Sequence, residues 1–328
     1  MYLAGKGSTQ AWPIAWLDST GKTKPLLSSP GSFPRFSPDG QRLALTVSSK
    51  GSDIFVYDWQ RESMTRLSFD GHSLSPVWSP DGADIAFRSV SDRFNISWVR
   101  SSGAGEPQQL LHSENVIVPW SFSPDGRRLA YHEFNPETGY DIWTLPLDTA
   151  DPDHPKPGKP EPFLRTPFDE LVPAFSPDGR WIAYRSNVSG SAEICVQPFS
   201  ATGGKWQISS GGGLFPFWSK NGHELFYETP DNWIMAVDYT VNGDSFAPSK
   251  PRLWSEKQVF HPSGLVNLDL APDGKRFAVP AARETARPEK GSVHVIFLLN
   301  FFDELKRRVP AGGKWSKYSN ALKDQGLL

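Results

Sequence analysis

The chain has 328 residues, including 30 prolines, 28 glycines and 13 tryptophans, and its formal net charge at pH 7 is −2. This near-neutral balance excludes the basic patch of a nucleic-acid-binding protein and the cationic face of a protein that docks on an anionic membrane. The single cysteine, Cys195, excludes an internal disulfide, and its apolar strand context predicts a buried, inert thiol.

Residues 1–27 contain three short segments with the alternating apolar pattern of strands, MYLAG, PIAWLD and TKPLL. The chain does not start with a basic region followed by an apolar run, so we expect no signal peptide. The longest apolar stretch, residues 293–302, is too short to span a membrane. These features predict a chain that does not insert into a membrane by itself.

Six copies of Ser-Pro-Asp-Gly or a close variant follow, each between a short apolar segment and an alternating apolar strand. Proline presets φ for the first corner of a type I turn, and glycine accepts the positive φ that lets an antiparallel strand continue. Each copy therefore predicts a β-hairpin. The copies end at Gly40, Gly82, Gly126, Gly179, Gly222 and Gly274. Their period of roughly 40–50 residues is typical of a β-propeller with one four-stranded blade per repeat.

The remaining strands follow the same period. Second strands are predicted from residues 42, 84, 128, 181, 224 and 276, and third strands from residues 53, 141, 193, 233 and 293. Insertions at 147–162 and 238–251 lie between third and fourth strands, and their composition predicts exposed loops. We interpret residues 301–308 as an edge strand.

The fold class predicted from these elements is all-β: a β-propeller of four-stranded antiparallel blades, formed by residues 1–310 as a single domain. Residues 311–328 have no strand period and are expected to be a disordered tail. We favour six blades, with residues 1–27 completing the last blade by pairing N-terminal with C-terminal strands. The alternative is seven blades, in which residues 1–27 form an incomplete blade whose first strand lies upstream of Met1.

The repeats P-x-[FW]-S-P-D-G-x-x-[IL]-A-[FY] resemble the WD-like blades of the TolB family over residues 32–309. The ordered series IAWLDSTGK, PFDELVPAFSPDGRWIAYRSNVSGSAEICVQPF, GGKWQISSGGGLFPFWSKNGHELFY and FLLNFFDELKR is more specific. It resembles the C-terminal extracytoplasmic propeller of membrane-anchored bacterial serine/threonine protein kinases, of the kind abundant in acidobacteria. The resemblance implies a kinase domain and a transmembrane helix ahead of the propeller, and it does not make this chain a kinase.

The sequence contains no complete catalytic motif of a kinase, a hydrolase or a metalloenzyme. The glycine-rich loop, the H-R-D loop and the D-F-G site of a kinase are all missing. Residues 71–75, GHSLS, miss the last glycine of the G-x-S-x-G elbow, and no residues remain for a hydrolase domain. The seven histidines are scattered one or two to a blade, without metal-ligand spacing. We expect no catalytic residue, no cofactor and no metal site, and leave open a metal bound in the channel.

Binding is expected in the loops that lead from fourth to first strands and from second to third strands, because these surround one mouth of the propeller channel. The alternative is that they are ordinary solvated turns. The candidate residues for binding a ligand or partner are Asp70, His72, Arg93, Glu114, Asn115, Asp169, Glu170 and Asn187. Their carboxylates predict a negative potential at this mouth and a preference for a cationic partner.

The predicted function is that of a non-catalytic sensor or scaffold that binds a protein, a peptide or a small ligand as a monomer, as the propeller part of a bacterial signalling kinase. The alternatives are an accessory propeller of a hydrolase or peptidase, and an enzyme whose site at the channel mouth has no linear motif. In a membrane-anchored kinase the propeller would be extracytoplasmic, in the periplasm. A chain complete as given, with no targeting signal, would be cytoplasmic.

Overall fold

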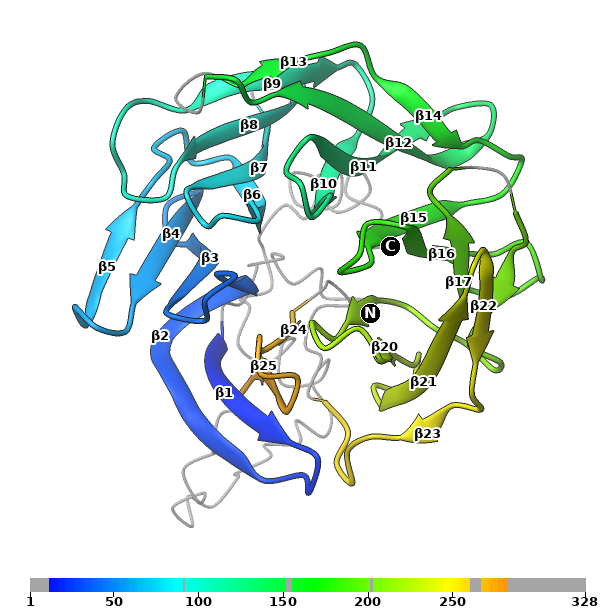
Figure 1. Cartoon of the computed structure of the whole chain (residues 1–328). Coiled ribbons are helices and arrows are strands. Elements are labelled where there is room, and N and C mark those ends of the chain that lie inside the picture. Colours follow the sequence, from blue (N-terminus) through cyan, green and yellow to red (C-terminus); the bar gives the residue numbers. More distant parts are fainter. Residues whose placement is uncertain (1–11, 91, 152–154, 201–202, 260–266, 282–328) are drawn as a thin grey trace, which may run out of the picture. The chain divides into compact units, whose positions relative to one another are not determined.

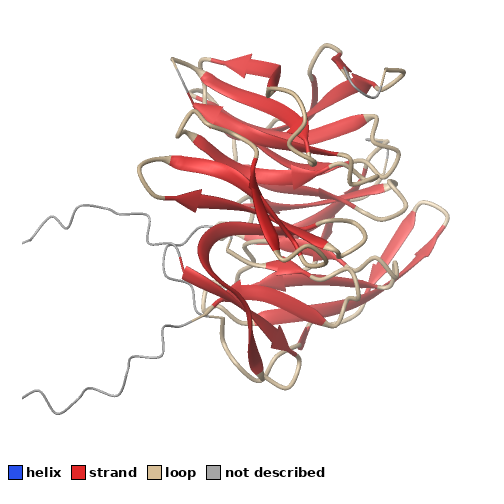
Figure 2. Ribbon diagram, turned by 90° about the vertical axis from the view of Figure 1, so that its left-hand side faces the viewer, coloured by secondary structure: helices blue, strands red, loops and turns tan. Residues whose placement is uncertain are grey.

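The computed structural model describes residues 12–90, 92–151, 155–200, 203–259 and 267–281, which all belong to one compact unit, residues 1–283. They form strands and connecting turns without a helix (Figure 2). Within this described part no helix could therefore cross a membrane. The segment MYLAG, the strands expected at 293–299 and 301–308 and the tail 311–328 lie outside the described residues.

The strands pair into antiparallel sheets that follow one another in chain order around a common centre (Figure 1). One sheet has the order β6 (Ser73–Trp78), β7 (Asp84–Val90), β8 (Phe94–Arg100) and β9 (Gln108–Ser113). Another has the order β15 (Glu170–Phe175), β16 (Trp181–Ser186), β17 (Glu193–Pro198) and β18 (Trp206–Gln207). We call each such four-stranded unit a blade and its first strand the inner strand.

Two further sheets each consist of a four-stranded blade and one additional short strand. The first comprises β10 (Ile117–Phe122), β11 (Arg128–Asn135), β12 (Gly139–Asp148) and β14 (Glu161–Leu164), with β13 (Lys156–Pro157) paired to the end of β12. The second comprises β19 (Pro216–Trp218), β20 (Glu224–Glu228), β21 (Ile234–Asn242) and β23 (Arg252–Leu253), with β22 (Ser245–Pro248) paired to the end of β21.

The last sheet joins the two ends of the described chain. Its order is β24 (Asp269–Leu270), β25 (Arg276–Pro280), β1 (Trp12–Asp18), β2 (Thr23–Phe36), β3 (Arg42–Ser48), β4 (Ser52–Asp58) and β5 (Ser63–Arg66). The first half of β2 pairs with β1 and its second half with β3, so this sheet contains two four-stranded units that share β2. The pairing of β1 with β25 is the one that the six-blade arrangement requires. The number of blades stays a prediction.

The apolar core lies between neighbouring sheets. In one such layer Trp181, Ala183 and Val196 of one blade pack against Leu225 and Tyr227 of the next. Burial of each large apolar side chain contributes about 1.5–3 kcal/mol to folding. Repetition of these layers holds each blade against its neighbours and fixes the inner strands around the centre.

The thiol of Cys195 is 1% exposed, which confirms the buried position predicted for it, and burial raises its pKa. It packs beside Ala130 and Ile142 of the preceding blade. A thiol with a raised pKa carries little thiolate at neutral pH, and the thiolate is the reactive form. The side chain therefore serves as a small apolar group of the core.

The insertion at 238–251 is not the exposed loop expected from its composition. Strand β21 continues to Asn242, and β22 folds back on it as a hairpin. Phe246 on β22 is 2% exposed and packs with Trp181, Trp218 and Tyr239. One aromatic side chain in a polar segment therefore anchors the insertion to the core. The insertion at 147–162 forms the short strand β13, whose two residues are exposed.

The predicted hairpins are confirmed in detail. In the fourth copy the amide of Gly179 donates to the carbonyl of Ser176 at 2.9 Å, and Gly179 has φ of 71°. The hydroxyl of Ser176 donates to the carboxylate of Asp178 at 2.6 Å, and the amide of Arg180 donates to the same oxygen at 3.1 Å. The aspartate is thus a turn former whose carboxylate is bonded within its own hairpin.

Candidate functional site

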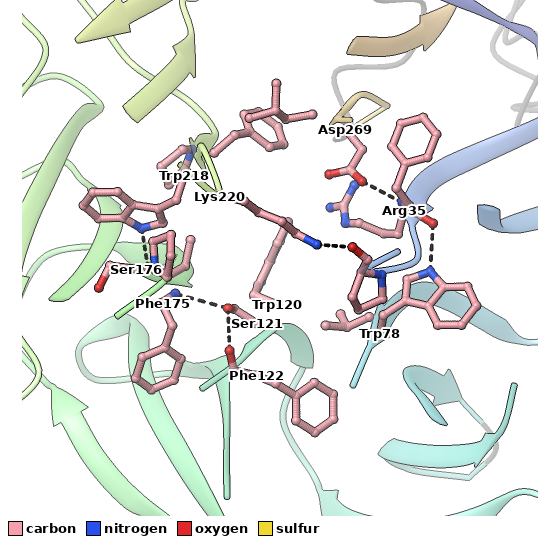
Figure 3. Close-up of a pocket in the computed structure, with 18 of the residues that line it drawn as sticks. Arg35, Trp78, Trp120, Ser121, Phe122, Phe175, Ser176, Trp218, Lys220 and Asp269 are labelled. Carbon is pink, nitrogen blue, oxygen red and sulfur yellow. Dashed lines mark hydrogen bonds between the residues drawn. The ribbon is translucent and has the colours of Figure 1, made fainter. Parts of the chain in front are cut away.

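The inner strands β2, β6, β10, β15, β19 and β24 all contribute to one pocket of about 480 Å³ (Figure 3). Prolines of the hairpins also line it, namely Pro38, Pro80, Pro124, Pro177 and Pro272. The pocket therefore lies at the end of the channel where first strands turn into second strands. We call it the hairpin-end pocket.

Tryptophans held by inter-blade hydrogen bonds form much of its wall. The indole nitrogen of Trp78 donates to the carbonyl of Arg35 at 2.8 Å, and that of Trp218 donates to the carbonyl of Ala174 at 2.9 Å. Each bond joins one inner strand to the inner strand of the preceding blade. Because the indole donors are used in this way, the rings present apolar faces and edges to the pocket.

The inner strands carry an irregularity where they approach the pocket. Phe33, Ser75 and Val172, each followed by a proline, have φ of 53°, 57° and 58°. The pairing of the inner strand with the second strand shifts register at each of these positions. β-Bulges of this kind bend a strand and change the direction of its side chains. Here the bulges lie at or just before the residues of these inner strands that line the pocket.

Three charged side chains line the hairpin-end pocket: Arg35, Lys220 and Asp269. Arg35 donates to the carbonyls of Pro34 at 2.8 Å and Leu268 at 3.1 Å. The carboxylate of Asp269 accepts the amide of Phe36 at 2.7 Å. These bonds fasten β2 to the segment around β24.

Burial raises the pKa of Asp269 to about 6, and the nearby charge of Arg35 opposes this shift. Desolvation lowers the pKa of Lys220, whose ammonium reaches across the pocket to the carbonyl of Pro38 (Figure 3). Two cationic groups and one carboxyl thus share an apolar enclosure. Such a site suits a ligand with an apolar body and a hydrogen-bond acceptor or an anionic group.

The hydroxyl groups of the pocket already have partners. Ser121 accepts the amide of Phe175 at 3.1 Å and donates to the carbonyl of Phe122, also at 3.1 Å. Ser176 belongs to its own hairpin, as described above. Neither hydroxyl bonds to a histidine of the described residues, the arrangement that would activate it as a nucleophile. Among the described residues no group of three or more His, Cys, Asp and Glu side chains could hold a metal ion.

The residues singled out from the sequence lie outside this pocket. Asp70 accepts the amide of His72 at 3.0 Å and the hydroxyl of Ser73 at 2.8 Å, so its carboxylate stabilises its own turn. The backbone of His72 forms a bridge with Ser52 and accepts the amide of Val90 at 3.2 Å. These contacts account for Asp70 and for the main chain of His72.

Arg93 and Glu114 come together as an exposed ion pair, with Nε and Oε1 at 3.1 Å. The backbone amide of Asn115 donates to the hydroxyl of Ser113 at 3.0 Å. An exposed pair of this kind contributes little to stability, since both ions remain solvated. The carboxylate of Glu114 is nevertheless neutralised by Arg93 and adds no free negative charge.

Asp169 and Asn187 are also brought together. The amide of Asp169 donates to Oδ1 of Asn187 at 2.9 Å, and Nδ2 of Asn187 donates back to the Asp169 carboxylate at 3.1 Å. The same carboxylate accepts the amide of Tyr140 at 3.1 Å. Asp169 therefore joins two neighbouring blades, a role that its position in a loop sequence did not indicate.

Glu170 is not in the exposed loop where the sequence placed it. It starts β15 and is 1% exposed, and it accepts the hydroxyl of Thr166 at 2.7 Å. Burial raises the pKa of Glu170, because a desolvated carboxylate is unfavourable. Glu170 is the first residue of β15, and the first four residues of this strand are all buried.

A sequence pattern could have indicated the aromatic wall of the hairpin-end pocket, but no pattern indicated its charged side chains. An aromatic residue precedes five of the six hairpin copies at the same place, and Trp78, Phe175 and Trp218 occupy that place. Arg35 and Asp269 lie in two repeats at opposite ends of the sequence. They come close because β1 pairs with β25, which joins the N-terminal and C-terminal strands in one sheet. No local sequence pattern describes this pairing.

No family model matches the chain. It is similar to the uncharacterized peptidase YuxL of Bacillus subtilis, with 25% identity over 197 residues, 48% of this chain and 29% of that protein. It is also similar to a TolB homolog of Chlorobium chlorochromatii, with 37% identity over 99 residues, 30% of this chain and 22% of that protein. The chain thus matches less than a third of the length of either curated relative.

Among solved structures, the chain is similar to a putative TolB from Agrobacterium tumefaciens. The TM-score is 0.58 at 19% identity, and the match covers 83% of this chain and 98% of that chain. These likenesses show a TolB-like β-propeller fold. At this identity a structural match establishes the fold alone.

Proposed function

We propose that the chain is a non-enzymatic binding module that takes an apolar segment of a partner protein, or a small apolar ligand, into the hairpin-end pocket. The observation that carries the proposal is the pocket itself, of about 480 Å³, to which six inner strands contribute. A concave apolar site with a few convergent polar groups is the usual form of a ligand site. We further propose six blades, closed by the pairing of β1 with β25.

A blocking variant tests the pocket. Ala174 lines it, and Ala174→Phe places a ring in the space that a ligand would occupy. The matched control is Ala104→Phe, at an exposed position of a turn. Three peptide arrays, one apolar (aromatic and aliphatic), one basic and one acidic, would be probed with wild type and both variants. We expect apolar peptides to bind wild type and the control, and to bind the blocked variant about tenfold more weakly or worse.

The melting temperature of each variant shows whether it is folded. The binding of Ala174→Phe is compared only if this variant is folded. Binding of the apolar peptides that is equal in the blocked variant would contradict the proposal. So would a preference of wild type for basic or acidic peptides that the blocked variant retains.

A role as the sensor part of a signalling kinase, outside the cytoplasm, is the finer proposal. Its support is the ordered series of sequence segments that resembles kinase propellers. The genomic DNA upstream of the codon for Met1 tests it. A kinase reading frame that ends in an apolar helix and continues into this sequence is expected, and an unrelated upstream frame would contradict it.

The second candidate is an accessory propeller of a peptidase system, favoured by the similarity to a peptidase relative over 48% of this chain. A hydrolase reading frame beside this one in the genome would support it. An enzyme acting by itself is tested by assays of ATP hydrolysis, phosphotransfer, esterase and peptidase activity. We expect no turnover, and turnover that disappears in Ser121→Ala would overturn the non-enzymatic proposal.

A further inference from the structure

The second strands place one variable residue each toward the end of the channel that lies opposite the hairpin-end pocket. This residue comes six positions after the hairpin glycine, and the second strand runs away from the hairpin. The six residues are Thr46, Arg88, His132, Arg185, Glu228 and Pro280. Three consecutive blades therefore carry Arg88, His132 and Arg185 at equivalent places.

His132, in the middle of the three, is buried and neutral. Its Nδ1 accepts the indole N–H of Trp120 at 2.9 Å, and the amide of Val172 lies 3.5 Å from the same atom. Burial, and then the charges of Arg185 and Arg88, lower the pKa of His132 to about 3. The proton of the neutral ring is therefore on Nε2, because Nδ1 is the acceptor. The ring centroid of Tyr140 lies 5.2 Å from that of His132.

Both arginines are half-buried, and within the described part of the chain neither takes part in a hydrogen bond or an ion pair. Nε of Arg88 is buried without an acceptor, and the guanidinium of Arg88 lies over the ring of Phe94 at 5.2 Å. A guanidinium has five donors, and donors withdrawn from water are costly unless they are paired.

Arg88 and Arg185 flank His132, because the three residues occupy equivalent places on the second strands of three consecutive blades. The charges of both arginines act on His132, in agreement with this placement. Desolvation is the main cause that lowers the pKa of each arginine. The carboxylate that acts on Arg185 is Asp169, which is held by the amides of Tyr140 and Asn187 and makes no ion pair with Arg185 among the described residues. The carboxylate that acts on Arg185 is therefore already engaged by other groups.

We propose that Arg88 and Arg185 jointly bind an oxyanion, the carboxylate or phosphate group of a ligand, at the end of the channel opposite the hairpin-end pocket. Guanidinium groups bind planar and tetrahedral oxyanions through paired hydrogen bonds, and partial desolvation strengthens these bonds. Tyr140 supplies a further donor, and the neutral His132 adds no charge. This site is independent of the function proposed for the other pocket, and its sign is opposite to the cationic preference expected from the sequence.

Titration calorimetry with succinate and with inorganic phosphate tests the site, and sodium chloride at equal ionic strength is the control for screening. We expect saturable binding of one of them to wild type. The variants Arg88→Gln and Arg185→Gln should each weaken it about tenfold or more, because each removes a charge-assisted pair of hydrogen bonds. Tighter binding of succinate identifies a carboxylate source, and tighter binding of phosphate identifies a phosphate source.

The matched control is the double variant Arg61→Gln/Arg127→Gln, which removes two exposed positive charges elsewhere. It should bind the anion as wild type does. Thermal melts without anion check folding, and Arg88→Lys, which keeps the charge but not the planar group, should recover part of the affinity. Equal binding to wild type and to Arg88→Gln/Arg185→Gln, or no saturable binding of either anion at millimolar concentration, would overturn the proposal.

Discussion

The two ends of the channel are built from the same repeat, yet they differ in whether equivalent positions carry the same residue type. At the hairpin end, Asp39, Asp81, Asp125 and Asp178 each accept a serine hydroxyl and a backbone amide of their own turn. At the other end, the equivalent second-strand positions carry different residue types, among them Arg88 and Arg185. The repeated residues here maintain the scaffold, whereas the residue type at the second-strand positions differs from blade to blade.

The largest expected effect is at a hairpin. Gly179 has φ of 71°, and a Cβ at this position would lie 3.2 Å from Cδ of Pro124 in the preceding blade. Gly179→Val should therefore lower the free energy of unfolding by about 3 kcal/mol, the upper part of the range for a strained backbone. Chemical denaturation measures it. A loss no larger than that of Asp169→Ala at the other end would show that the hairpins are not the more constrained region.

The next largest loss of stability is expected for Asp169→Ala. The change leaves the amide of Tyr140 and the side chain of Asn187 without their acceptor. An unpaired, partly buried donor costs about 1–2 kcal/mol. Asp169→Asn keeps an acceptor oxygen and should lose less. If both variants melt as wild type does, the bond between these two blades is not needed.

The hairpin-end pocket should make stability depend on pH through Asp269. Its folded pKa is raised to about 6, above an unfolded value of about 3.9, so the folded state binds more protons between these values. Stability from this group is present below about pH 4 and is lost as the pH rises to about 6. Relative to wild type, Asp269→Asn should gain about 3 kcal/mol over this window, because one pKa unit corresponds to about 1.4 kcal/mol. Asp231→Asn, at an exposed turn, is the control, and parallel pH profiles would contradict the shift.

The hairpin carboxylates should act in the opposite direction. Hydrogen bonds from Ser37 and Ser123 are the main cause that lowers the pKa of Asp39 and Asp125. Their stabilisation is present above the unfolded pKa of about 3.9 and is lost as the pH falls below it. The profile of Asp269→Asn should retain this acid limb.

The smallest effect is expected for the ion pair between Arg93 and Glu114. Both side chains are exposed, so Glu114→Gln should change the free energy of unfolding by less than about 0.5 kcal/mol. The change should vanish in high salt, because exposed charges are screened. A loss that persists at 1 M salt would show a structural role for this loop.

The repeat period, the hairpins and the burial of Cys195 were predictable from the sequence, because each depends on contacts within a few residues or on a fixed alternation. The same holds for the aromatic positions before five of the six hairpins. A turn that closes its own hydrogen bonds adopts one geometry wherever it occurs, so local pattern is enough to predict it.

The charges of the site depended on tertiary structure. Arg35 meets Asp269 because the pairing of β1 with β25 joins N-terminal and C-terminal strands in one sheet. Arg88 and Arg185 flank His132 because three consecutive blades face one centre. Glu170 lies at the start of strand β15, whose first four residues are all buried by the surrounding blades. Such placements bring together residues of different repeats, and the desolvation that changes their pKa values arises from the packed neighbours. The sequence determined the repeating unit, and the packing of units determined where charge is free.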